Sequence, residues 1–64
     1  MEEAFKRTML KELKYEINRL KSFKDEVWEH YLKLGNDFSY FHYKSIENQI
    51  RDVEKTMEVI KSIH

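Results

Sequence analysis

The chain contains no cysteine and no proline, and it has only one glycine in 64 residues. The absence of cysteine rules out disulfides and zinc sites built from thiolates. A core of this size seldom contributes more than about 3–5 kcal/mol of stability, so small domains usually need a further stabilising contact. With disulfides excluded, a partner subunit is the leading candidate for that contact.

Long apolar runs are also missing. No stretch approaches the ~20 residues that a membrane span requires, and the first ten residues, MEEAFKRTML, lack the apolar segment of a secretory signal. We therefore expect a cytoplasmic protein that does not enter membranes. Twelve basic and twelve acidic residues leave the chain neutral, which gives it no general electrostatic attraction to nucleic acid or anionic lipid.

The charges are nevertheless distributed unevenly along the chain. Residues 1–24 carry seven basic and four acidic side chains, a local charge of +3. Residues 25–43 carry four acidic side chains and one basic, a local charge of −3, and residues 44–64 carry four of each. Antiparallel or head-to-tail self-association would bring the two opposite charges together.

The tripeptide Gly35-Asn36-Asp37 is the only strong break in the pattern. Glycine favours the left-handed conformation that ends a helix, and Asn or Asp caps the start of the next. The sequence predicts two helices, over about 3–34 and 38–63, within a single all-α domain that spans residues 1–64. We expect Asp37 to be the N-cap of the second helix, with Ser39 as the alternative.

Apolar side chains recur at alternating spacings of three and four residues in both halves, which is the pattern of a coiled-coil seam. The predicted seam of the first helix comprises Leu10, Leu13, Ile17, Leu20, Lys24, Val27, Tyr31 and Leu34, and Lys24 is its only polar member. The predicted seam of the second helix comprises Tyr43, Ile46, Ile50, Val53, Met57 and Ile60. The two helices should therefore pack as an antiparallel hairpin.

The register of this hairpin depends on the length of the turn. If residues 35–42 all take part in the turn, Leu34 lies opposite Tyr43 and Tyr31 lies opposite Ile46. This register also brings Lys21 of the first helix near Glu54 of the second, where they would form a weak surface ion pair. A tighter turn would slide these layers by several residues.

Several apolar side chains lie outside the predicted contact between the two helices. The first helix is longer than the second, so Phe5, Met9 and Leu10 should overhang, and Phe23 and Trp28 flank the seam. Because large exposed apolar patches mark interfaces, we predict that two hairpins form a four-helix bundle. The residues predicted at this homodimer interface are Phe5, Met9, Phe23 and Lys24. Lys24 either fixes the register and partner number or only extends its ammonium to water.

The segment GNDFSYFHY, residues 35–43, holds four of the nine aromatic residues of the chain. Aromatic rings concentrate binding energy at protein interfaces. We therefore predict a partner-binding surface at this end of the hairpin. Its residues are Trp28, Tyr31, Phe38, Tyr40 and Phe41.

Reactive groups do not form a recognisable catalytic pattern. Glu26 and His30 are four residues apart on one helical face, a spacing that can bind a metal, and His42 could approach His30 across the turn. No further ligand is visible, so we predict no metal site. The sequence also lacks a nucleophile motif and a glycine-rich phosphate loop. We predict a protein that is not an enzyme and binds no cofactor.

The function most consistent with these features is protein–protein interaction. We expect a small regulator, inhibitor or adaptor that acts as a helical-hairpin homodimer. Two alternatives stay open: a purely structural self-assembling bundle, and a nucleic-acid accessory protein. The second would use the basic stripe of the first helix, Lys6, Arg7, Lys11, Lys14, Arg19 and Lys21.

Overall fold

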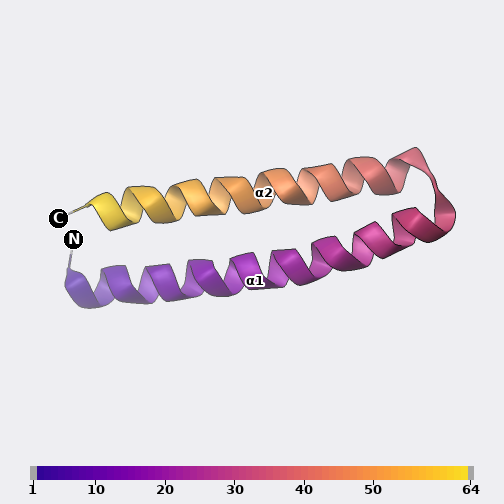
Figure 1. Ribbon diagram of the computed structural model, residues 1–64. Coiled ribbons are helices and arrows are strands. Elements are labelled where there is room, and N and C mark those ends of the chain that lie inside the picture. Colours follow the sequence, from indigo (N-terminus) through magenta and orange to yellow (C-terminus); the bar gives the residue numbers. More distant parts are fainter. Residues whose placement is uncertain (1, 64) are drawn as a thin grey trace.

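In the computed structural model, which describes residues 2–63, the chain forms two antiparallel α-helices that lie side by side (Figure 1). Helix α1 spans Glu3–Leu34 and helix α2 spans Asp37–Ser62. The predicted helical hairpin is confirmed, with the bounds of α1 as predicted and those of α2 within one residue. The Cα atoms extend over 47 × 15 × 10 Å, so the molecule is a narrow rod.

The turn between the helices consists of only two residues. Gly35 adopts the left-handed conformation with φ 63°, and its N–H donates to the carbonyl oxygen of Tyr31 at 2.7 Å. The Asn36 side-chain oxygen accepts a hydrogen bond from the backbone N–H of Ser39 at 2.8 Å. Asn36 is therefore the N-cap, and the prediction of Asp37 was wrong. Asp37 instead lies in the first turn of α2, where a negative charge interacts favourably with the positive end of the helix dipole.

Replacing the cap provides a first test of this turn. Asn36→Ala removes the acceptor for the Ser39 N–H, and the loss of an N-cap lowers the free energy of unfolding by about 1 kcal/mol. In a domain of this size, that change lowers Tm by roughly 4–8 °C, which thermal unfolding followed by circular dichroism would measure. Asn48→Ala, on the exposed middle of α2, is the control and should leave Tm equal or slightly higher. Equal Tm values for the two variants would contradict the capping role.

The core lies along the predicted seam. Ile17, Leu20, Val27, Ile46 and Ile50 are buried together, with Tyr43, Val53 and Met57 packed against them. All eight are residues that the seven-residue repeat assigned to the seam, which confirms that prediction.

The register differs from the predicted one by a heptad. The ring of Tyr43 lies 4.9 Å from that of Trp28, and the ring of Tyr40 lies 5.7 Å from that of Tyr31 (centroid distances). The predicted pairing of Tyr43 with Leu34 was therefore wrong. Because the turn uses two residues rather than eight, α2 is shifted by one heptad relative to α1. The same shift brings Ser39 into the seam, where it is buried.

At the other end of the rod, α1 begins beside the end of α2 (Figure 1). The Lys6 ammonium donates to the backbone carbonyls of Ile63 at 2.7 Å and Lys61 at 3.2 Å. Met9 and Leu10 are half-buried. The predicted overhang of these two residues was wrong, because the heptad shift extends α2 along α1 as far as Lys6. Phe5, one residue further out, is mostly exposed.

Candidate protein interface

The hairpin has two broad faces, one on each side of the seam, and their residues follow from the seven-residue spacing and the contacts across the seam. The first contains Phe23, whose ring meets that of His42 edge-on at 5.4 Å. We call it the Phe23 face, and its residues are Met9, Glu16, Phe23, His30, His42, Gln49 and Thr56. The opposite side is the Lys21 face, and its residues are Arg7, Lys14, Lys21, Trp28, Tyr40, Glu47, Glu54 and Lys61. The Phe23 face has few charged residues, whereas the Lys21 face has many.

Four aromatic rings pack together near the turn. Trp28 contacts Tyr31 and Tyr43, with centroids 5.3 and 4.9 Å apart, and Tyr31 contacts Tyr40 at 5.7 Å. We call Trp28, Tyr31, Tyr40 and Tyr43 the ring cluster. The Lys24 ammonium lies 5.8 Å from the centre of the Tyr43 ring. Tyr31 and Tyr43 are half-buried, so this cluster contributes to the stability of the hairpin as well as to its surface.

Three large side chains at the turn project into solvent. Phe38 is 80% exposed, Phe41 is 68% exposed and Leu34 is 65% exposed. We call these three the turn cluster. Phe38 and Phe41 belong to the first turns of α2, which the Asn36 cap holds in helical form, so their rings project from an ordered backbone. Exposed apolar side chains grouped in this way are typical of a binding surface.

The five residues predicted to bind a partner all lie at this end, but the structure divides them. Trp28, Tyr31 and Tyr40 belong to the ring cluster and contact one another or Tyr43. Phe38 and Phe41 lie outside the seam and are more exposed, although the Phe41 ring meets that of Tyr40 edge-on at 6.0 Å. Sequence reasoning missed Leu34, which it assigned to the core. The signal that could have identified it is the Gly35-Asn36 pair, which is sufficient to form a two-residue turn.

The residues predicted at the oligomer interface are divided between the two faces. Phe23 is 42% exposed, and Met9 shares its face, with Phe5 one turn before Met9. Lys24 points to the other side, where it lines a hollow with Lys21 and Glu47. The proximity of its ammonium to the Tyr43 ring accounts for this direction.

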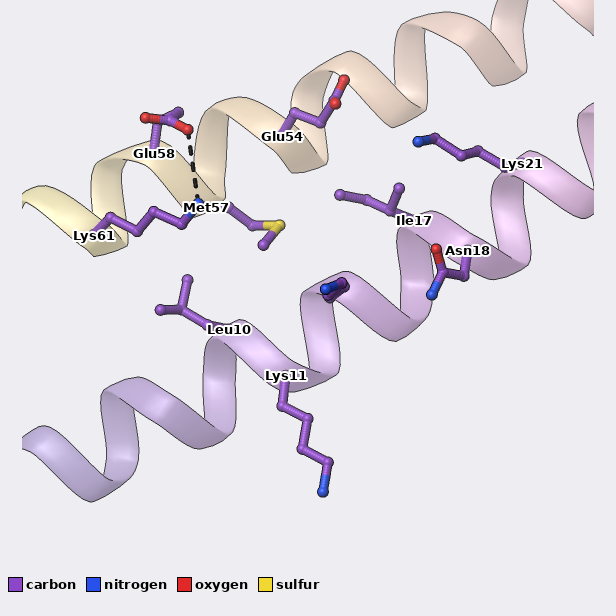
Figure 2. Close-up of a pocket in the computed structure, with 10 residues that line it drawn as sticks. Leu10, Lys11, Ile17, Asn18, Lys21, Glu54, Met57, Glu58 and Lys61 are labelled. Atoms are coloured by element: carbon purple, nitrogen blue, oxygen red, sulfur yellow. Dashed lines mark ion pairs between the residues drawn. The ribbon is translucent and has the colours of Figure 1, made fainter.

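The Lys21 face contains a groove of about 600 Å³ towards the chain ends. In Figure 2, Leu10 and Ile17 of α1 and Met57 of α2 point into the space between the helices, and charged side chains surround them. Lys21 and Glu54 both line this groove but form no ion pair, so that predicted contact was wrong. Their separation follows from the heptad shift of α2.

Each ion pair of residues 2–63 joins two residues of the same helix, and none joins α1 to α2. Lys44 pairs with Glu47 at 3.2 Å, Lys61 pairs with Glu58 at 3.9 Å (Figure 2), and Arg19 pairs with Glu16. The hydrogen bond from Arg19 lowers the pKa of the Glu16 carboxyl, and the bond to Glu47 raises the pKa of Lys44. These exposed pairs neutralise charge locally and do not join the two helices.

The candidate metal ligands lie near one another beside the turn. Glu26, His30 and His42 line a hollow of about 270 Å³ on the Phe23 face, together with Phe23. The His42 ring lies 5.4 Å from that of Phe23 and 6.3 Å from that of Phe38 (centroid distances). Across residues 2–63, no three acidic, histidine or cysteine side chains are placed to hold a metal ion.

The described surface therefore carries exposed apolar side chains in the turn cluster, and the Phe23 face adds Phe23 and Met9. Such surfaces bind by removing apolar area from water. In the described chain, neither helix combines enough length and apolar character to cross a membrane. No protein-family model matches this chain, and neither does any curated protein or solved structure.

Proposed function

We propose that this chain is a non-enzymatic protein–protein interaction module, a small regulator, inhibitor or adaptor that acts as a helical-hairpin homodimer. Its partner-binding site is the turn end, with Phe38 and Phe41 as the central contacts and Trp28, Tyr31 and Tyr40 beside them. The observation that carries the proposal is the 80% and 68% exposure of two phenylalanines on a capped helix.

The free energy gained by burying these two phenylalanines supports this choice of site. Burying an exposed phenylalanine against a partner contributes about 1.5–3 kcal/mol, so two such rings supply a large share of the affinity of a typical complex. Their backbone is ordered before binding, so little conformational entropy is lost there on association. The ring cluster extends the surface with an indole N–H, which donates hydrogen bonds, and with tyrosine hydroxyls, which donate and accept them.

Charge disfavours the nucleic-acid alternative. Of the basic stripe of α1, Lys6 binds the end of α2 and Arg19 pairs with Glu16. Lys14 and Lys21 share their face with Glu47 and Glu54. Nucleic-acid affinity requires uncompensated basic side chains, which this face does not concentrate.

The test of the turn end compares capture of a binding partner by variant chains. Phe38→Ser with Phe41→Ser should leave the helical circular-dichroism signal unchanged and reduce recovery of the bound protein at least tenfold. Extracts of the source organism would be passed over immobilised wild-type and variant chains, and the bound proteins would be quantified by mass spectrometry. Any protein captured by the wild type would then be purified and its Kd measured directly.

Tyr15→Ser is the matched control, because Tyr15 is an exposed aromatic residue on the outer surface of α1, away from the turn. It should retain full capture. If the double variant loses its helical signal, the two rings are structural and the proposed site is incorrect. If the double variant binds a purified partner as tightly as wild type, the turn end is not the binding site.

A further inference from the structure

The two faces of the hairpin differ in how readily a second protein chain could cover them. On the Phe23 face the only charged residue among the positions defined above is Glu16, which is already paired with Arg19, and one further carboxylate, that of Glu26, lines the hollow on this face. On the Lys21 face, six of the eight positions are charged. Burying unpaired charges is costly, whereas burying Met9 and Phe23 is favourable. The Phe23 face is therefore the one suited to close packing.

The direction of the covering chain follows from the charges along the rod. The part of α1 far from the turn belongs to residues 1–24, with local charge +3, and the turn end belongs to residues 25–43, with local charge −3. Two copies in the same direction would place like charges together, and two in opposite directions would pair them. Building on the homodimer of the proposed function, we infer that a second copy covers the Phe23 face in the antiparallel direction, with the turns at opposite ends.

The seven-residue spacing tests whether such a dimer is geometrically consistent. In a two-fold arrangement that sets Glu16 opposite the partner's Phe23, Met9 falls opposite the partner's His30. The symmetry axis then crosses α1 between Arg19 and Leu20. On α2, setting His42 opposite the partner's Thr56 places Gln49 on the axis.

The two helices must cross that axis at the same level, and the contacts within one hairpin indicate that they do. The Phe23–His42 and Lys6–Ile63 contacts relate positions on α1 to positions on α2. We count residues along α1 and α2 from each of these contacts. In both cases, the residue of α2 that is level with Leu20 lies within about one helical turn of Gln49. The two helices therefore meet the axis at the same level to within about one helical turn.

The shape of the face provides a specific contact. The hollow lined by Phe23, Glu26, His30 and His42 lies near the turn, and Met9 lies on the same face near the other end. In the antiparallel dimer, Met9 of each copy is at the level of the partner's hollow. The unbranched, flexible side chain of methionine is well suited to fill an irregular space of this kind.

The area of the face is also adequate. A rod with Cα extents of 47 by 15 Å offers roughly 700 Å² on one broad side. A standard stable interface uses about 800 Å² per partner. A second copy has the same length and covers the whole face, as a four-helix bundle requires.

Because the chain has no cysteine, introduced cysteines can report the arrangement directly. Met9→Cys and isotope-labelled His30→Cys chains would be mixed, refolded together and oxidised, and their disulfides assigned by mass spectrometry. The antiparallel dimer predicts that the mixed disulfide, which joins position 9 of one chain to position 30 of the other, clearly exceeds the half that random pairing would give. Lys14→Cys with labelled Lys21→Cys is the control for the opposite face, and its mixed product should stay at or below half.

Sedimentation equilibrium of the wild type completes the experiment and separates the two proposals. A dimer with the mixed product from positions 9 and 30 supports both. A dimer that gives the mixed product only from positions 14 and 21, or from neither pair, would overturn the inferred face and leave the homodimer intact. A monomer at every concentration would overturn the homodimer itself.

A charge substitution gives an independent measure of the same contact. Phe23→Glu sets a carboxylate opposite the partner's Glu16, and we expect the dimer Kd to rise at least about tenfold, the change that 1.4 kcal/mol makes. Tyr15→Glu, on the outer surface of α1, is the control and should leave Kd unchanged. Equal Kd values for the two variants would contradict the assignment of the Phe23 face.

Discussion

Ile46→Ala is expected to remove most of the stability of the hairpin. Ile46 is only 1% exposed, the lowest value in the described core, and it packs with buried residues of both helices. Truncating a buried isoleucine to alanine costs about 2–5 kcal/mol, through lost transfer energy and the cavity that remains. This loss is comparable to the roughly 3–5 kcal/mol that a core of this size provides. The variant should therefore be largely unfolded in the absence of a ligand or partner.

Urea denaturation followed by circular dichroism would measure this effect. The control is Val59→Ala, which removes apolar atoms from an exposed position of the same helix and should change the free energy of unfolding by less than about 0.5 kcal/mol. If the Ile46→Ala midpoint matched that of the control, the core would not lie where the structure places it. Both curves should be recorded at several protein concentrations, because dimerisation would raise the midpoints.

Lys24→Leu is expected to have the opposite effect and raise Tm. Lys24 occupies a seam position but turns its ammonium towards the Tyr43 ring at 5.8 Å. An exposed contact of this type contributes about 0.5–1 kcal/mol, whereas a leucine buried in the seam contributes about 1.5–3 kcal/mol. The difference favours leucine by roughly 1–2 kcal/mol, which corresponds to a Tm increase of about 5–15 °C in a domain of this size.

The same substitution addresses the specificity of assembly. A single polar residue in an apolar seam can fix partner number at a cost in stability. Lys24→Leu should therefore yield several oligomeric species by sedimentation velocity where the wild type yields one. Lys55→Leu, on the outer surface of α2, is the control for added hydrophobicity and should alter neither quantity. A higher Tm with one unchanged oligomer would assign Lys24 a purely local role.

The sequence was sufficient to predict the helices and their inner faces, but not the register. The seven-residue repeat identifies Leu20 and Ile50 as seam residues in any register, because a shift by one heptad preserves every seam position. The choice between registers depended on the length of the turn, which is two residues in the structure and eight in the predicted register. The repeat alone could not decide between these lengths, because both keep the same residues in the seam. The burial of Ser39 follows from the shorter turn.

The candidate interface could be predicted only in part, for a related reason. The exposure of Phe38 and Phe41 followed from their positions outside the seam, which hold in either register. The contacts of Trp28 with Tyr43 and of Tyr31 with Tyr40 depend on the register and could not be foreseen. Leu34 was assigned to the core because the longer turn would have given it a seam partner.

The two-residue turn also determines the order in which the hairpin assembles. Closing a short loop costs little chain entropy, and the cost increases as the joined residues become more distant in sequence. The ring cluster lies next to the turn and can form early, whereas the Lys6–Ile63 hydrogen bond joins residues 57 positions apart and must form late. Partial opening should therefore begin at the chain ends and proceed towards the turn. The turn cluster thus stands on the part of the molecule that forms first during folding and is lost last during unfolding.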